Sequence, residues 1–306
     1  MTPTRQGSFH LFRFAGIDVF LHWSWFVVAA FELTGRSKDY SSPVWNALEY
    51  LALFLIVLLH EFGHALACRQ VGGQASLIVL WPLGGVAYVN PPPRPGATLW
   101  SIAAGPLVNV ALAPILIGLW LLGRSLGWAQ TMPDAYGLLQ AVTVINVALL
   151  LFNVLPIYPL DGGQMLRALL WFALGRARSL LVASLVGLLG VAALLALAVW
   201  ERSVWMGVMA AFILLNCWRG YLQARALVRA AQAPRHDGFA CPVCKVAPGK
   251  GAFWGCGKCR TAFDTFATGA VCPQCGEQFP ATACPDCGAL TPMAAWRIPP
   301  PLPPKM

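Results

Sequence analysis

Charged side chains are scarce in this 306-residue chain, since Asp, Glu, Lys and Arg make up 11% of it and apolar residues 58%. Soluble domains carry about 25% charged residues. Twelve acidic and 21 basic side chains can barely cover a soluble core of this size with a polar surface. Because several apolar runs are also long enough to cross a bilayer, a wholly soluble protein is excluded.

Two other features are missing. The N-terminus has no signal peptide with a small-residue cleavage site, so we expect the first apolar run to be retained. The net charge of +9 forms no dense basic stripe, because most arginines flank apolar runs. That distribution is typical of membrane topology, and we do not expect nucleic acid as a partner.

The apolar runs predict an all-α polytopic membrane protein with six transmembrane helices, at about 17–33, 44–68, 97–123, 136–155, 179–200 and 203–222. Residues 72–96 differ, because glycines and prolines punctuate β-prone pieces at 76–80 and 86–90. Irregular backbone at membrane depth is tolerated only where protein buries it or where it lines a wet cavity. We therefore predict a membrane-associated β-hairpin loop beside the second helix.

Six spans place both termini on one side of a cell membrane. With that side cytosolic, only Arg36, Lys38, Arg124 and Arg202 of the flanking basic residues lie outside. Eleven arginines lie inside: Arg5, Arg13, Arg69, Arg94, Arg167, Arg176, Arg178, Arg219, Arg225, Arg229 and Arg235. This asymmetry predicts cytosolic termini.

The second apolar run contains His60-Glu61-Phe-Gly-His64. Its histidines lie one helical turn apart on one face, as two ligands of Zn²⁺ would, and Glu61 can take a proton from a water at the metal. Ionisable residues inside an apolar segment are costly and usually functional. Asp161 is the best third ligand, because it follows a proline-interrupted segment and precedes Gly162 and Gly163; it could also cap the helix that follows.

These motifs, together with Asn153-Val-Leu-Pro-Ile-Tyr-Pro-Leu-Asp161-Gly-Gly, resemble the site-2 protease family of intramembrane zinc metalloproteases over roughly residues 15–222. The resemblance implies that His60, His64 and Asp161 hold a catalytic zinc. It implies that Glu61 is the general base and later the proton donor, and that Asn153 binds the substrate or the developing oxyanion.

Two further segments resemble elements of the family. Trp81–Val86 is similar to its membrane-associated β-loop, which makes Gly84, Gly85 and Val86 candidate substrate contacts. Gly105-Pro-Leu-Val-Asn109 resembles a family element in the third span; Asn109 is a candidate substrate contact, although we favour helix packing there. An exposed edge in residues 76–90 could accept an unwound substrate strand, and proline at Val86 or Tyr88 would then impair cleavage without loss of zinc.

Eight of the ten cysteines lie in four Cys-x-x-Cys pairs after residue 235. In the reducing cytosol such pairs favour zinc over disulfides. Sequential pairing predicts two structural zinc sites, the first with Cys241, Cys244, Cys256 and Cys259 and the second with Cys272, Cys275, Cys284 and Cys287; interleaved pairing is the alternative. The predicted domains are 1–235 (membrane protease), 236–292 (tandem zinc ribbon) and 293–306 (proline-rich tail).

The sequence thus predicts a zinc metalloprotease that cuts a transmembrane segment of another protein in the lipid bilayer, with two ribbon zincs besides the catalytic one. The ribbon has a structural role or recruits a regulator. The alternatives are a zinc transporter, which would need several ligand sets along a path, and a catalytically silent scaffold, against which the complete set of His60, Glu61, His64 and Asp161 argues.

Overall fold

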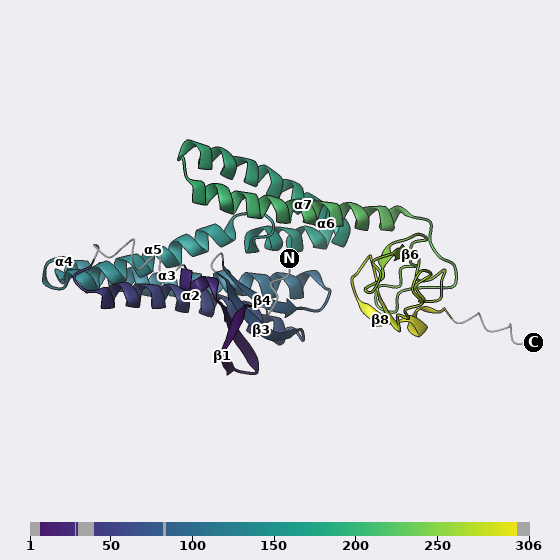
Figure 1. Ribbon diagram of the computed structural model, residues 1–306, viewed down its shortest axis with the longest axis horizontal. Coiled ribbons are helices and arrows are strands. Elements are labelled where there is room, and N and C mark those ends of the chain that lie inside the picture. Colours follow the sequence, from purple (N-terminus) through teal and green to yellow (C-terminus); the bar gives the residue numbers. More distant parts are fainter. Residues whose placement is uncertain (1–6, 28, 30–39, 82–83, 299–306) are drawn as a thin grey trace, which may run out of the picture.

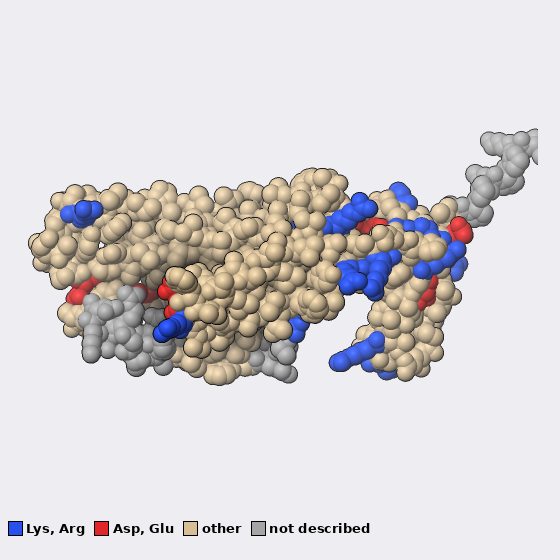
Figure 2. Space-filling view, turned by 90° about the horizontal axis from the view of Figure 1, so that it is seen from above, with Lys and Arg blue, Asp and Glu red and all other residues tan. Residues whose placement is uncertain are grey.

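A computed structural model describes residues 7–27, 29, 40–81 and 84–298. Long helices lie side by side, a sheet packs against one of them, and a small cysteine-rich domain follows at one end (Figure 1). Lys and Arg gather at that end, whereas the visible face of the helical body is almost free of charge (Figure 2). The outer surface of the helical body therefore suits lipid.

Four of the described helices are long and apolar enough to cross a membrane: α2 (Pro43–Gln70), α3 (Pro95–Ser125), α5 (Pro133–Val154) and α6 (Asp161–Trp200). The first three begin with proline, whose missing N–H costs no helical hydrogen bond at that position. Three of them contain one of the predicted apolar runs, and α5 ends one residue before the end of the run 136–155. The short α4 (Trp128–Thr131) connects α3 to α5.

Helix α6 is two helical segments joined at Gly175, whose φ of 75° suits glycine. The first segment begins with Asp161, and the second contains the predicted run 179–200. Helix α7 (Val204–Gln232) begins at the Ser203 cap and runs back beside α6 toward the cysteine-rich domain (Figure 1).

The first predicted transmembrane run, 17–33, is wrong in its first part. Ile17–His22 forms strand β2, which pairs antiparallel with β1 (Ser8–Phe14) and parallel with β3 (Gln74–Trp81). Apolarity alone cannot distinguish a buried strand from a membrane helix. Later parts of the run, residues 28 and 30–33, lie outside the described residues.

The predicted hairpin at 72–96 is confirmed. Strand β3 pairs antiparallel with β4 (Gly84–Asn90), and the sheet order is β1-β2-β3-β4, so β4 is an edge strand. The sheet packs on α2 through Ile17, Ile78 and Leu80, which contact the helix side around Phe62 and Ala65. This packing holds β4 beside the middle of α2.

The cysteine-rich domain has two small hairpins, β5 (Trp254–Gly255) with β6 (Ala262–Phe263) and β7 (Ala281–Ala283) with β8 (Leu290–Pro292). A short helix η1 (Met293–Trp296) follows, and Trp296 is fully buried against Phe266 and the cysteines. The domain therefore extends past the predicted boundary at 292, because Trp296 belongs to its core. The remaining predicted tail, 299–306, lies outside the described residues.

Candidate active site and metal centres

The three predicted ligands of the catalytic metal converge. His60 and His64 lie on one face of α2, with their Nε2 atoms 3.1 Å apart. Asp161 reaches them from the start of α6: its Oδ2 lies 3.0 Å from Nε2 of His60 and 3.2 Å from Nε2 of His64. Residues about 100 positions apart in the chain thus form one cluster.

The donor set fits zinc. Two imidazole nitrogens and one carboxylate oxygen lie within 4.8 Å of one another. Three such protein ligands with a remaining open position are typical of catalytic zinc sites. Both histidines are buried, and the Asp161 side chain is only 14% exposed, so an ion here would be sheltered from bulk water.

Hydrogen bonds behind the histidines orient both rings. Nδ1 of His64 lies 2.9 Å from the carbonyl oxygen of Ser101, and Nδ1 of His60 lies 2.7 Å from Oδ1 of Asn109. An N–H donated from Nδ1 leaves the lone pair on Nε2 for the metal. Asn109 is fully buried behind His60, so its prediction as a substrate contact is wrong: burial leaves it no surface to offer.

Close approach of α3 to the histidines requires Gly105. A Cβ at Gly105 would lie 2.2 Å from Nε2 of His64 and 2.8 Å from Nε2 of His60. Glycine is also needed on the α2 side of this contact, at Gly63 next to His64. A Cβ at Gly63 would lie 2.7 Å from the carbonyl oxygen of Ala104 in α3. Small residues at this crossing let the helix backbones meet.

The side chain of Glu61 extends from α2 toward the edge strand β4. Its Oε2 accepts a hydrogen bond of 2.8 Å from the backbone N–H of Ala87 in β4. A Cβ at Gly85 would lie 2.2 Å from Cγ of Glu61, so glycine is needed there. The other two predicted substrate contacts, Gly84 and Val86, lie in the same strand, opposite Trp81 and Val79 of β3.

Asn153 lies in the last turn of α5, before the loop that leads to Asp161. It is half-buried and makes no side-chain hydrogen bond to any described residue. The loop folds back tightly on α6, because Gly162 and Gly163 contact the backbone of Val154 and Tyr158 where any Cβ would clash. The motif thus holds Asn153 and Asp161 on either side of one tight turn.

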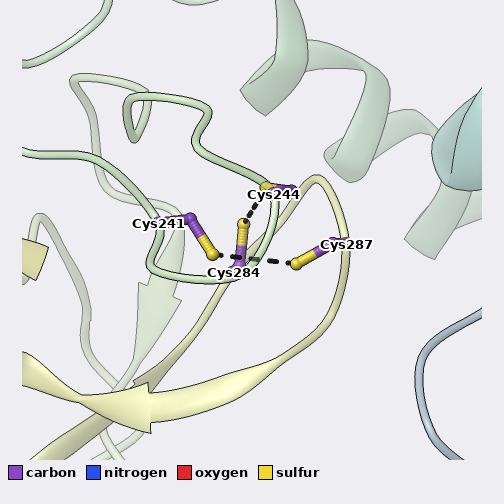
Figure 3. A group of neighbouring side chains, drawn as sticks. All are labelled: Cys241, Cys244, Cys284 and Cys287. Carbon is purple, nitrogen blue, oxygen red and sulfur yellow. Dashed lines mark hydrogen bonds between the residues drawn. The ribbon is translucent and has the colours of Figure 1, made fainter. Parts of the chain in front are cut away.

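The cysteines group differently from the sequential expectation, which is wrong. Cys241 and Cys244 meet Cys284 and Cys287, whose sulfurs point toward one another (Figure 3). Cys256 and Cys259 meet Cys272 and Cys275 inside this outer pair along the chain. The interleaved alternative is also wrong, because the first pair meets the fourth and the second meets the third, so that one site is nested inside the other along the chain.

Hairpins and a shared core explain this nested order. Cys256–Cys259 lies in the turn between β5 and β6, and Cys284–Cys287 in the turn between β7 and β8. Phe266 and Trp296 pack against Cys241 and Cys284, whereas Phe263 packs against Cys256 and Cys272. Packing of aromatic side chains far along the chain therefore decides the pairing, and spacing between cysteines does not reveal it.

The cysteine geometry suits tetrahedral metal sites. Sγ–Sγ distances are 3.8 and 3.7 Å in the outer site and 3.5 and 3.6 Å in the inner one. A tetrahedral zinc with Zn–S bonds of about 2.3 Å separates its sulfurs by about 3.8 Å. Hydrogen bonding with Thr261 lowers the pKa of Cys259 to about 6, whereas burial and the neighbouring thiolates raise the pKa of Cys284. A central cation would favour the thiolate form of all four ligands.

The outer cysteine site contacts the helical body. The guanidinium of Arg176, next to the α6 break, donates to the carbonyl oxygen of Cys284 at 3.4 Å. Gly288 lies so close to that guanidinium that a Cβ there would sit 2.3 Å from its Nη1. Past the end of α7, Arg235 pairs with Asp286 at 3.0 Å. None of these contacts was predicted from the sequence.

Other functional contacts also went unpredicted. The carbonyl of Ser101 and the amide of Ala87 are backbone groups, which no residue type reveals. Asn146 was detectable, because an amide inside the apolar run 136–155 must find a partner. Its side chain bonds to that of Asn109 at 2.9 Å.

Known proteins match the helical part of the chain. The family model "Peptidase family M50" matches residues 49–136 and 127–197. A zinc metalloprotease of Methanocaldococcus jannaschii, MJ0392, is 34% identical over 180 residues, which are 59% of this chain and 50% of that protein. Stage IV sporulation protein FB of Bacillus subtilis is 32% identical over 146 residues, 46% of this chain and 43% of that protein. The chain spans about half the length of these curated relatives.

The fold has a solved counterpart. A site-2 protease from Methanocaldococcus jannaschii matches 70% of this chain and 95% of its own, with a TM-score of 0.50 and 26% identity. The matched region of the family model contains His60, Glu61, His64 and Asp161, the residues that converge in the helical body. The chain belongs to peptidase family M50, the family of the site-2 proteases.

Proposed function

We propose that the chain is an intramembrane zinc metalloprotease that hydrolyses a peptide bond within the transmembrane segment of another membrane protein. The observation that carries this proposal is the convergence of His60, His64 and Asp161 beside Glu61, inside a body of apolar helices. Family membership and the zinc metalloprotease relative support it. Cleavage would release a cytosolic fragment of the substrate.

The residues supply the required chemistry. A zinc ion bound by His60, His64 and Asp161 would provide a Lewis acid for peptide hydrolysis at neutral pH. Glu61, held by the N–H of Ala87, takes a proton from the attacking water at its carboxylate and passes it to the leaving amine. Asn153, whose amide has no partner among the described residues, donates a hydrogen bond to the substrate carbonyl as charge develops there.

Substrate presentation would use the edge of β4. Peptide bonds inside a helix are shielded, so the substrate must unwind locally and can then add to an open strand edge. The N–H of Ala87 points away from β3, toward Glu61, so alternate residues of β4 offer backbone groups on the side of the site. Gly84, Gly85 and Val86 would lie beside the added strand.

The number of zinc ions and the orientation in the membrane are inferred from the cysteine groups and from the distribution of arginines. We propose one catalytic zinc and two structural zincs, in the nested cysteine sites, with the ribbon as a place where a regulator binds. In the proposed orientation the chain crosses a cell membrane several times and both termini lie in the cytosol. The arginine asymmetry and the basic end of the molecule support it (Figure 2).

The test uses the full chain in liposomes with single-span substrates. Wild type should cut within the span, and Glu61→Gln should lose at least about 100-fold in rate while keeping its zinc. Glu201→Gln, the same chemical change in the exposed loop after α6, is the matched control and should cut normally.

Equal cleavage by wild type and Glu61→Gln would refute the proposed mechanism. Zinc flux into the same liposomes, without cleavage, would favour the transporter instead. The described part of the helical body supports the protease more strongly, because it holds one compact group of ligands and no second set along a path.

A further inference from the structure

Asn146 of α5 is connected to the catalytic metal site through one intervening side chain. Its Oδ1 accepts a hydrogen bond of 2.9 Å from Nδ2 of Asn109, whose own Oδ1 faces Nδ1 of His60 at 2.7 Å. Nδ2 of Asn146 donates back to the carbonyl oxygen of Asn109 at 3.0 Å. Both asparagines are fully buried, so water cannot replace these bonds.

The direction of the hydrogen bonds matters. Nε2 of His60 faces His64 and Asp161, so a metal there needs the lone pair on Nε2 and the proton on Nδ1. An Nδ1–H requires an acceptor, and only the oxygen end of the Asn109 amide can accept. A flipped amide would present its NH₂ group to His60 and favour the wrong tautomer.

Asn146 determines which end of the Asn109 side-chain amide faces His60. Because its Oδ1 can only accept, the amide of Asn109 must direct Nδ2 toward Asn146 and Oδ1 toward His60. We propose that Asn146 is a positioning residue that fixes the orientation of the Asn109 amide, and through it the tautomer of the zinc ligand His60. The proposal rests on the zinc chemistry proposed above, but its test needs no substrate.

The relay also ties the metal site to α5. Asn153 lies seven residues after Asn146, hence two turns farther along nearly the same face of that helix. One face of α5 therefore carries both the amide that positions a metal ligand and the amide proposed to meet the substrate.

The experiment measures zinc affinity of the full chain in detergent by competition with a chelator. Asn146→Leu should weaken the catalytic zinc about 10- to 100-fold, the range typical of lost ligand-orienting partners. The zincs of the cysteine sites, in the same chain, should be retained as an internal reference, and helicity by circular dichroism equal to that of wild type should show that the helical body is folded. Thr143→Val is the matched control, because Thr143 is buried one turn earlier on α5 and bonds only to the backbone of Leu116 and Leu139.

A double variant separates positioning from packing. In Asn109→Asp both side-chain oxygens can accept from His60, so the orientation no longer needs to be selected. Asn146→Leu should then cost less than about threefold in that background. An equal loss in both backgrounds, or no loss in the single variant, would overturn the proposal whether or not the protein cleaves a substrate.

Discussion

The four Cys-x-x-Cys turns of the ribbon share one backbone feature at the residue after the second cysteine. Lys245, Arg260, Gly276 and Gly288 have φ values of 62°, 63°, 72° and 81°. In each turn the backbone N–H of this residue donates a hydrogen bond to the carbonyl oxygen of the first cysteine. Two of the turns therefore hold a side chain in the left-handed region, which costs roughly 1–2 kcal/mol per non-glycine residue.

This repetition gives a prediction for the ribbon. Gly276→Ala should weaken zinc retention by about 1 kcal/mol, since the left-handed φ penalises Ala while no atom lies near enough to clash. Lys245→Gly should be neutral or should strengthen it by up to about 1 kcal/mol. Competition with a chelator measures both, and a loss in Lys245→Gly equal to that of Gly276→Ala would contradict the backbone explanation.

Gly85 gives a second prediction, for catalysis. In Gly85→Ala the new methyl would overlap the Glu61 side chain, which must move away from the N–H of Ala87. The rate of cleavage should fall at least tenfold while zinc content stays unchanged, because no metal ligand contacts Gly85. Gly72→Ala, at a glycine with no atom within 4 Å, controls for loop strain. Normal cleavage by Gly85→Ala would show that Glu61 needs no fixed position.

Among the elements, the helices were the most predictable from sequence. Long apolar runs predicted α2, α3, α5 and the second segment of α6. Glycines and prolines around β-prone pieces predicted the β3–β4 hairpin. The run that begins at Ile17 failed, because β2 gains its burial from pairing with β3, more than 50 residues away. Such non-local pairing leaves no local trace in the sequence.

At the site, residue types were sufficient to identify His60, His64 and Asp161 as a candidate metal-binding group, and the structure brings the three side chains together. Residue types were insufficient for Asn109, whose role depends on which neighbour its amide faces. The nested cysteine pairing was likewise hidden, because the burial of Phe266 and Trp296 decides it.

The position of β4 also changes how strand addition is best tested. Because Ala87 points its N–H away from β3, proline at Val86 or Tyr88 would break the β3–β4 ladder instead of the open edge. Val89 lies two residues after Ala87 in β4, so strand alternation predicts that its N–H faces the same side, although the register of β3 shifts opposite it. Val89→Pro should slow cleavage several-fold with zinc retained, and Val89→Ala, which keeps the N–H, should cut normally. Similar rates for the two variants would exclude strand addition at this position.

At the scale of the whole molecule, the ribbon contacts α6, the helix that carries the proposed metal ligand Asp161. Arg176, which contacts the Cys284 turn, directly follows Gly175, where the helical segment that begins with Asp161 ends. Four thiolates around one Zn²⁺ carry a net charge of −2, so a filled outer site would attract this guanidinium. Docking of the ribbon should therefore depend on its metal.

Arg176→Gln should loosen the ribbon, so that protease cuts the connection after α7 several-fold faster than in wild type. Removing ribbon zinc with a chelator should have the same effect in wild type and little further effect in the variant. Arg178→Gln, an exposed arginine two residues along, is the control. A ribbon held equally firmly in all these samples would show that Arg176 contributes nothing to docking.

The nested order of the cysteines also fixes the order in which the ribbon can mature during synthesis. A chain grows from its N-terminus, so the inner site has all four sulfurs once Cys275 is made. The outer site must wait for Cys287, 46 residues after its first ligand, and for Trp296 to fill the core. A ribosome that stops between Cys275 and Cys284 would leave a chain with a complete inner site but without the turn that Arg176 binds. Metal uptake at the outer site would thus mark the moment when the chain has been translated far enough for the ribbon to meet the helices.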